Sequence, residues 1–328
     1  MAGDGVALIG APTDVGAGVR GARLGPDALR VAGLAQRLRA LGLRVSDRGN
    51  LEGPDNPEQA PVHGYRHLPQ VVAWCRSVFD AVGCELAADR LPLLIGGDHS
   101  LSAGSVSAVA RHCRGAGRRL RVLWLDAHAD FNTGKLSPTG NLHGMPLAIL
   151  CGSGPAPLTR LGGRKPAIAA DTVRLLGVRS VDSGEGGRVL EAGLPLRDMR
   201  AIDKQGMRAV MAWALADLAP DDHLHLSLDL DFLDPMLAPG VSTPVPGGPG
   251  YREALLCMGM IADTGRLGSV DLVELNPARD ERNRSAEVAV DLMESLFGRR
   301  TLPREAGPAA ARGALPATRG AAAGFSRR

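Results

Sequence analysis

A short apolar run that ends directly on three potential metal ligands is the strongest constraint on how this chain folds. Residues 122–125 have the length and composition of a buried strand, and Asp126, His128 and Asp130 follow at alternate positions. A chain that leaves a strand can turn such side chains towards one point. In open α/β sheets, ligands bind outside the carboxyl ends of the parallel strands. The pattern therefore predicts both a fold class and the place of a site.

Two other apolar runs end in the same way. Residues 91–95 lead to His99, and residues 223–228 lead to Asp229 and Asp231. One such motif alone is compatible with a capping or surface role, but three strand ends of this kind favour a metal site. Four carboxylates brought together would repel one another, and two divalent cations about 3.5–4 Å apart would neutralise them. Carboxylates and imidazoles without a thiolate favour Mn²⁺, with Co²⁺, Ni²⁺ or Zn²⁺ as competitors.

Strand-like and helix-like segments alternate along the chain, which predicts a parallel sheet with right-handed crossovers. An amphipathic helix is expected over residues 204–218, and Ser285 is expected to cap the last helix. The remaining strands are expected at residues 6–11, 173–178 and 270–275, with another that starts at 43–45 and a weak short one over 194–199.

The length and composition fit one large α/β domain. Of the 328 residues 45% are hydrophobic but only 3% aromatic, so the core must be aliphatic. We expect a single folded domain over residues 1–300. Residues 301–328 are rich in Ala, Gly, Pro and Arg with few apolar anchors, which predicts a disordered tail.

Charge and cysteine content exclude several classes of protein. The net charge is +3, but residues 299–328 hold seven arginines and one glutamate, a net +6, which leaves −3 for the rest. A nucleic-acid-binding face is therefore not expected. The five cysteines form no CxxC pair, which favours free thiols in a reducing cytoplasm. No signal peptide and no transmembrane run of about 20 apolar residues is expected.

Together these motifs resemble those of a known family. Three segments are similar to the metal motifs of the ureohydrolases: GGDHS at 96–100, DAHAD at 126–130 and SLDLD at 227–231. Asn132 and the SPTGNLHG segment at 137–144 resemble arginase in particular. The resemblance extends from residue 6 to about residue 298. It implies one three-layer α/β domain with a central, mostly parallel eight-stranded sheet flanked by helices, as in arginases and deacetylases.

The resemblance also implies a metal centre of two Mn²⁺ per subunit. Asp126 and Asp229 match ligands that bridge the two ions. The residues that match ligands of the first ion are His99, Asp126, Asp130 and Asp229, and those that match ligands of the second are Asp126, His128, Asp229 and Asp231.

Catalytic and substrate-binding residues follow from the same resemblance. His143 matches a proton shuttle to the leaving amine, Glu274 matches the acid that pairs with the guanidinium, and Asp130 is expected to act in catalysis as well. The residues that match substrate contacts are Asn132 and Thr139 for the α-carboxylate, Asp182 with Glu185 behind it for the α-amine, and Thr243 near the scissile group. The family usually has serine at position 139, and some relatives have an acid at Ser180.

The activity implied is the conversion of L-arginine and water to L-ornithine and urea. Agmatinase and guanidinobutyrase remain as alternatives with the same metals, and a deacetylase-type zinc hydrolase or a catalytically silent subunit is less favoured. The only expected partners are L-arginine and further copies of the chain, as a homotrimer or homohexamer. Neither nucleic acid nor a membrane is expected, and the expected location is the cytoplasm.

Overall fold

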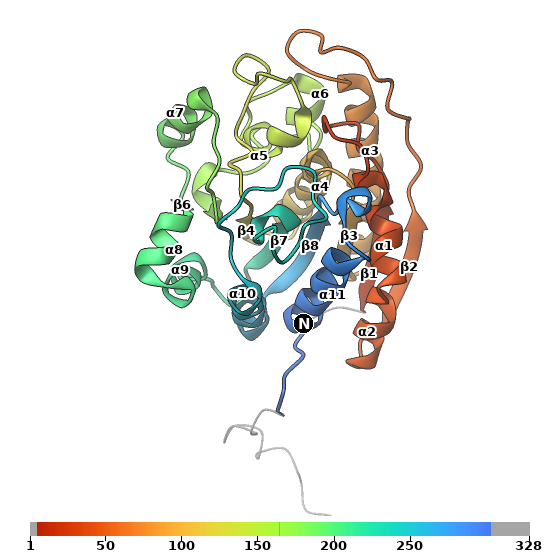
Figure 1. Cartoon of the computed structure of the whole chain (residues 1–328), viewed down its shortest axis with the longest axis vertical. Coiled ribbons are helices and arrows are strands. Elements are labelled where there is room, and N and C mark those ends of the chain that lie inside the picture. The colour runs from red at the N-terminus through yellow and green to blue at the C-terminus, as the bar shows by residue number, and fades with distance from the viewer. Residues whose placement is uncertain (1–4, 164, 303–328) are drawn as a thin grey trace, which may run out of the picture.

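The computed structural model describes residues 5–163 and 165–302. Its centre is one eight-stranded sheet in which every pair of neighbouring strands is parallel, in the order β2-β1-β3-β8-β7-β4-β5-β6 (Figure 1). The predicted three-layer α/β architecture is therefore confirmed. The strands are β1 (Val6–Ala11), β2 (Val45–Asn50), β3 (Leu91–Gly96), β4 (Leu120–Leu125), β5 (Val173–Leu176), β6 (Leu196–Arg197), β7 (His223–Asp229) and β8 (Leu267–Val273).

Helices cover both faces of the sheet (Figure 1). One face packs against α1 (Gly25–Val31), α2 (Leu34–Ala40), α8 (Met199–Gln205), α9 (Met207–Ala214), α10 (Tyr251–Thr264) and α11 (Arg284–Leu296). The other packs against α3 (Leu68–Ala87), α4 (Ser102–Gly115), α5 (Pro146–Leu150), α6 (Ala156–Thr159) and α7 (Ser183–Glu191). Short 3-10 helices are Ala22–Leu24, His99–Leu101, Leu142–Gly144, Ala170–Thr172, Leu230–Phe232 and Pro277–Arg279.

Alternation along the strands divides the core into two apolar layers. In β1, Leu8 belongs to the layer under α1 and α2, while its neighbour Ile9 belongs to the layer under α3 and α4. Successive side chains of a strand point to opposite faces, and a sheet covered on both faces therefore needs apolar residues throughout. The central strands β3 and β4 are buried at every position, as the sequence predicts.

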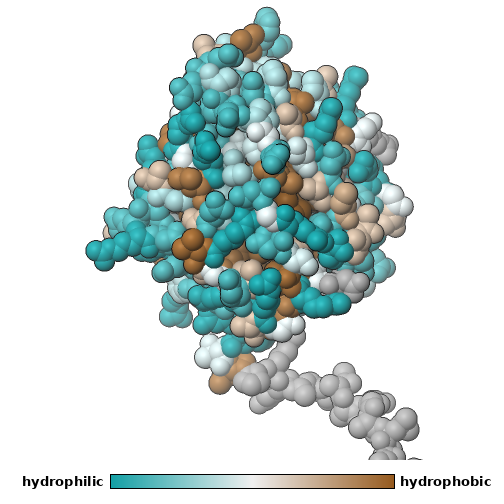
Figure 2. All heavy atoms as spheres, turned by 90° about the vertical axis from the view of Figure 1, so that its right-hand side faces the viewer, coloured by the Kyte–Doolittle hydropathy of each residue, from teal (hydrophilic) through white to brown (hydrophobic). Residues whose placement is uncertain are grey.

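The edge strand β2 is different, because most of its residues are exposed and polar. Polar and charged residues on an edge discourage pairing with a second sheet. The predicted strand start at residues 43–45 therefore leads into a polar strand that apolar patterning misses. Figure 2, which views the molecule from the right-hand side of Figure 1, shows a mostly hydrophilic face with scattered apolar residues.

Several local predictions need correction. The single helix expected over 204–218 is two helices, because Gly206 at φ 80° and ψ 147° separates α8 from α9. Only a glycine adopts that backbone conformation without strain. The weak strand expected at 194–199 is only the two residues of β6, and α8 begins at Met199.

Ser285 does not cap α11, whose N-cap is Asn283. The Ser285 hydroxyl instead donates to Asp280 and accepts from the Gly240 N–H. The predicted strands at 173–178 and 270–275 end earlier than expected, at Leu176 and Val273.

Further expectations concern the C-terminal tail, the cysteines and membrane-spanning helices. Most of the predicted tail, residues 303–328, lies outside the described residues. All five cysteines are free, and three of them are buried, as expected. Among the described helices, none is both long and apolar enough to cross a membrane.

Candidate active site

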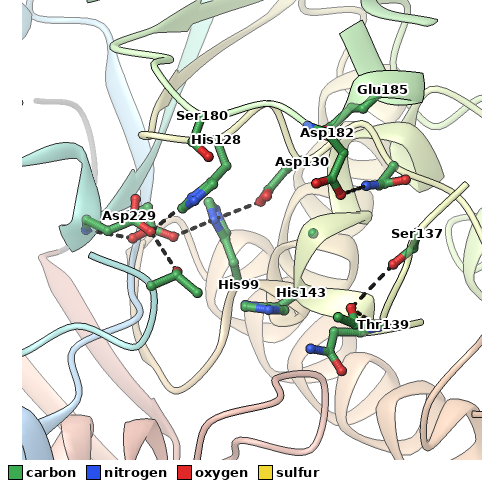
Figure 3. A pocket seen from close by; sticks show the side chains of 15 residues that line it. His99, His128, Asp130, Ser137, Thr139, His143, Ser180, Asp182, Glu185 and Asp229 are labelled. Atoms are coloured by element: carbon green, nitrogen blue, oxygen red, sulfur yellow. Dashed lines mark hydrogen bonds and ion pairs between the residues drawn. The ribbon is translucent and has the colours of Figure 1, made fainter. Parts of the chain in front are cut away.

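Four neighbouring strands bring the predicted residues to one edge of the sheet. In sheet order these are β3, β8, β7 and β4. His99, Glu274 and Asp126 follow β3, β8 and β4, and Asp229 is the last residue of β7. Adjacent parallel strands lie about 4.8 Å apart, so residues just beyond their carboxyl ends meet although they are far apart in sequence. Figure 3 shows the resulting pocket, with His99, His128, Asp130 and Asp229 pointing toward one another.

The first cluster converges on a single nitrogen. Nδ1 of His99 lies 3.1 Å from Oδ2 of Asp126, 3.0 Å from Oδ2 of Asp130 and 3.1 Å from Oδ2 of Asp229. One imidazole nitrogen carries at most one proton, so it cannot satisfy three carboxylates. Oδ2 of Asp130 is indeed a buried oxygen without a hydrogen bond. A cation at the common centre would satisfy all four atoms, and the donor set is the one that Mn²⁺ accepts.

A second cluster lies beside the first and shares a residue with it. Nδ1 of His128 is 3.1 Å from Oδ2 of Asp231 and 3.5 Å from Oδ1 of Asp126. Candidate ligand atoms of Asp126, His128 and Asp231 all lie within 4.8 Å of one another, as do those of His99, Asp126 and Asp130. Asp126 thus offers one oxygen to each side, which is the arrangement that a bridging carboxylate needs.

The electrostatics of the two clusters are unbalanced without cations. Burial, together with the charge of Asp126, raises the pKa of Asp130 to about 7. Burial and the charges of Asp231 and Asp126 raise the pKa of Asp229 as well. The pKa of Asp126 is lowered despite its burial, because His128 and His99 both face it. Buried carboxylates that repel one another in this way are expected at a site that binds cations.

Hydrogen bonds to nearby groups of the protein itself hold these candidate ligand side chains in place. Oδ1 of Asp126 accepts the His128 N–H at 2.7 Å, and Oδ1 of Asp229 accepts the Asp231 N–H at 2.7 Å. The alternate spacing of the ligands therefore has a structural basis, since each aspartate binds the backbone two residues on. The indole of Trp124 donates to Asp126 at 3.0 Å and stacks on the His99 ring at 4.4 Å.

Two site residues have strained backbones. Asp130 has φ 50° and Glu274 has φ 63°, values that non-glycine residues rarely adopt. Such strain costs on the order of 1–3 kcal/mol and persists where the surrounding structure fixes it, commonly at functional sites.

His143 and Glu274 form a buried pair beside the first cluster. Nδ1 of His143 lies 2.9 Å from Oε1 of Glu274, which also accepts the His99 N–H at 2.9 Å. Burial lowers the pKa of His143, but Glu274 outweighs burial and raises it to about 9. Glu274 lies behind His143 rather than on the pocket wall, and its other oxygen, Oε2, is buried without a hydrogen-bond partner.

The outer wall of the pocket is built from two loops. Asn132 donates to Asp182 at 2.7 Å, so the loop after β4 and the loop after β5 are joined. Glu185 accepts the Phe131 and Asp182 N–H groups, forming a capping box at the start of α7. Thr139 accepts the Asn141 N–H at 3.2 Å.

All of the predicted site residues except Asp126 and Glu274 line this pocket of about 140 Å³, and those two are buried next to lining residues that they contact. Thr243 lines it and donates to Asp231 at 3.0 Å. The lining residues that the sequence did not assign to the site are Ser137, Asn141, Gly144 and Ser180. Ser137 and Asn141 lie in the same segment as Thr139, so their position in the motif could have indicated them.

Comparisons with known proteins agree with this geometry. The family model described as "Arginase family" matches residues 4–298. Arginase from Brucella melitensis is 44% identical over 303 residues, covering 90% of this chain and 97% of that protein. The native structure of Bacillus caldovelox arginase has a TM-score of 0.86 at 42% identity, covering 91% of this chain and 100% of the other.

A crystal structure of Bacillus subtilis arginase gives a TM-score of 0.83 at 40% identity, with the same 91% and 100% coverage. Proclavaminate amidino hydrolase from Streptomyces clavuligerus shares the fold, with a TM-score of 0.68 at 23% identity. The matched region contains every residue of the two metal clusters, the buried His143–Glu274 pair and the two outer loops. By these contacts and by this similarity, the chain belongs to the arginase family of metal-dependent amidinohydrolases.

Proposed function

We propose that this protein hydrolyses L-arginine to L-ornithine and urea at a centre of two Mn²⁺ ions. The observation that carries the proposal is the convergence of three carboxylate oxygens on Nδ1 of His99, beside a second cluster that shares Asp126. Relatives at 38–44% identity that carry the name arginase support it.

The metal ligands in this proposal are the six that the sequence suggested. His99, Asp126, Asp130 and Asp229 would hold the first ion, and Asp126, His128, Asp229 and Asp231 the second. A guanidinium is a poor electrophile, so its hydrolysis needs a strong nucleophile at neutral pH. A pair of divalent cations, when bound, supplies activated water, because cations lower the pKa of water by several units.

The chain's own residues would then orient the reactants. Oδ2 of Asp130 would face the first ion, so the other carboxylate oxygen of Asp130 would accept a hydrogen bond from the attacking water. Oε2 of Glu274 has no hydrogen bond, and a guanidinium that reaches past the pocket lining would donate an N–H to it. The water oxygen would first add to the guanidinium carbon. The bond from that carbon to the ornithine nitrogen would then break, and the two protons that the water loses would end on the ornithine amine.

His143 would supply the proton that the leaving amine needs. Glu274 raises the pKa of His143 to about 9, so its imidazole is protonated at neutral pH and can donate. Thr243, which lines the pocket and donates to Asp231, would lie near the scissile group.

Specificity would come from the outer loops. Asn132 and Thr139 would bind the α-carboxylate, and Asp182 would bind the α-amine with Glu185 holding its loop in place. The hydrogen bond between Asn132 and Asp182 fixes the distance between these two halves. Agmatine has no α-carboxylate, so it would leave Asn132 and Thr139 without a partner.

The test is urea release by the Mn²⁺-loaded protein from L-arginine, agmatine and 4-guanidinobutyrate side by side. We expect arginine to be the best substrate by kcat/KM. Higher activity on agmatine would overturn the assignment of the outer loops, and no urea from any of the three would overturn the function.

We propose that the enzyme is cytoplasmic and homo-oligomeric. The free thiols are consistent with a reducing cytoplasm. The family resemblance suggests a homotrimer or homohexamer, which light scattering coupled to size-exclusion chromatography would distinguish.

A further inference from the structure

Arg179 has no role in the site described so far, yet its guanidinium lies against the backbone that carries a metal ligand. Nη2 donates to the carbonyl of Asp231 at 2.7 Å and to that of Leu233 at 3.1 Å. Nη1 donates to the carbonyl of Phe232 at 3.1 Å. Three successive carbonyls of the segment that follows β7 therefore bind one side chain.

The same guanidinium also holds the loop of Thr243. Nε and Nη2 of Arg179 donate to the carbonyl of Val245 at 3.0 and 2.8 Å. Thr243, two residues earlier, donates to the Asp231 carboxylate. Arg179 therefore fixes Asp231 in two ways. Its guanidinium binds the backbone carbonyl of Asp231, and it also binds the loop whose Thr243 donates to the Asp231 carboxylate.

The backbone of Arg179 holds the other metal-binding segment. The N–H groups of Arg179 and Ser180 both donate to the carbonyl of Ala127, at 2.9 and 3.0 Å. Ala127 lies between Asp126 and His128. Ser180 lines the pocket together with His128 (Figure 3). One residue thus joins the segment of Asp126 and His128 to the segment of Asp231.

The contacts of the guanidinium are unusual in their chemistry. All of its hydrogen bonds among the described residues go to backbone carbonyls, and none goes to a carboxylate. A half-buried cation bound in this way orders backbone rather than forming an ion pair. The planar fork of arginine offers five N–H donors in fixed directions, which a lysine ammonium cannot reproduce.

We propose that Arg179 is a positioning residue for the second metal ion, the one assigned to His128 and Asp231. It sets the affinity for that ion by fixing the Asp231 segment relative to Ala127, while His99 and Asp130 lie outside its contacts. The inference deepens the proposed function and rests on its two-ion centre. Groups that orient a metal ligand typically change metal affinity by about 10- to 100-fold when they are lost.

The test compares Arg179→Met and Arg179→Lys with Arg174→Met. Arg174 is a suitable control because it too binds backbone carbonyls, those of Asp171 and Val173, and is partly buried at the opposite end of β5. The metal-free proteins are titrated with Mn²⁺ against a competing chelator, and the two binding constants are fitted separately. Thermal unfolding of the metal-free variants is recorded alongside.

We expect Arg179→Met to weaken binding of the second ion at least about tenfold and binding of the first ion less than about threefold. Arg179→Lys should fall between it and the wild type, since it keeps the charge but loses the fork. Arg174→Met should bind both ions as the wild type does. If Arg179→Met does not fold, Arg179→Lys serves instead, and it should also lose more affinity for the second ion than for the first, by a smaller factor.

Unchanged affinity for both ions in either Arg179 variant would overturn the inference. So would an equal loss for both ions together with a lower melting temperature, because that is the result of a purely structural role. If the wild-type protein binds two ions but releases no urea from arginine, the proposed function fails while this inference survives. If the wild-type protein binds fewer than two ions, both fail.

Discussion

Polar residues occur along the whole length of strand β7, and those inside the sheet have different surroundings from those at the end of the strand. We call these two groups the interior half and the strand-end half. His223, His225 and Ser227 lie inside the sheet, and Asp229 and Asp231 lie at or beyond its end. All five are nearly inaccessible to solvent. Within the strand most polar atoms have hydrogen-bond partners in the protein, and Nε2 of His225, which has none, lies 3.4 Å from Oδ2 of Asp271. At the end of the strand the polar atoms converge on one another and on a pocket.

The interior half forms its own network under α4. Ser269 lies 2.9 Å from a ring nitrogen of both His223 and His225. Asp271 accepts from Ser102 at 2.8 Å and from Ser105 at 2.6 Å. Burial raises the pKa of Asp271, but the charge of His225 and these two hydroxyls outweigh it and lower that pKa. A buried polar group costs little once it is paired, so this half is stable without any ion.

The two halves meet at one contact. Nε2 of His99 lies 2.8 Å from the hydroxyl of Ser227, and Ser227 lies 3.3 Å from Ser102. A hydrogen bond at Nε2 leaves Nδ1 to face the carboxylates, which is how a neighbouring group selects the nitrogen that binds a metal. Polarity within a strand therefore does not mark a site by itself. A site is instead marked by polar atoms that face a pocket and lack enough hydrogen-bond donors.

The largest expected effect comes from the strand-end half, at the residue that both clusters share. Asp126→Asn removes a negative charge from each side, so we expect loss of at least one of the two ions and a fall in kcat/KM of about 10³-fold or more. Metal content per chain and urea release measure this. Two ions retained with near-normal turnover would show that Asp126 is not shared.

His143→Ala should impair turnover by at least about 10²-fold, because a positioned proton donor commonly contributes that much. Both ions should remain bound, since His143 contacts Glu274 rather than the clusters. The metal content of the purified variant is the decisive measurement. Loss of an ion from this variant would make His143 a ligand and contradict its role as a proton donor.

In the interior half, Asp271→Asn should affect stability more than chemistry. It weakens hydrogen bonds from two hydroxyls to a charged acceptor, which costs about 1.5–3 kcal/mol in the free energy of unfolding. Denaturant unfolding of the metal-free protein measures it, with Asp203→Asn at an exposed position as the control. Equal losses in the two variants would mean that the interior network contributes nothing special.

His223 should make stability depend on pH. Burial lowers the pKa of His223 to about 3, below the usual value of about 6.5 in an unfolded chain. Between these values the unfolded chain binds one more proton, so stability falls as pH falls from about 6.5, by up to about 1.4 kcal/mol per pH unit. Denaturant unfolding of the wild type and His223→Leu between pH 7 and 5 should therefore give diverging curves. Parallel curves would contradict the assignment.

The smallest effect is expected at the outer loops, beyond both halves of β7. Thr139→Ser keeps the hydroxyl and removes the β-branch, which frees the side-chain rotamer. We expect KM for arginine to change by less than about threefold, because a rotamer restriction is worth a fraction of 1 kcal/mol. A change above tenfold, measured by steady-state kinetics, would mean that the methyl group itself contacts the substrate.

The difference between the halves explains what could be predicted from sequence. Apolar runs that end in Asp126 and Asp229 indicated both the strands and the cluster, since strand length and ligand spacing are local properties. The interior network has no local signature, because Ser102 and Asp271 are 169 residues apart. The role of Arg179 was missed for the same reason, since an arginine after a strand is normally solvated.

Errors in the secondary structure also have local causes. Gly206 interrupts a continuous amphipathic pattern through backbone conformation alone, which hydrophobic periodicity does not record. Ser285 has the residue type of a helix cap, but its hydroxyl is used by Gly240 and Asp280 instead.

The most direct test of the two-ion centre is anomalous diffraction at the manganese edge from crystals of the Mn²⁺-loaded protein. We predict two peaks about 3.5–4 Å apart, one beside His99 and one beside His128, with Asp126 between them. A single peak, or peaks away from these histidines, would contradict the account.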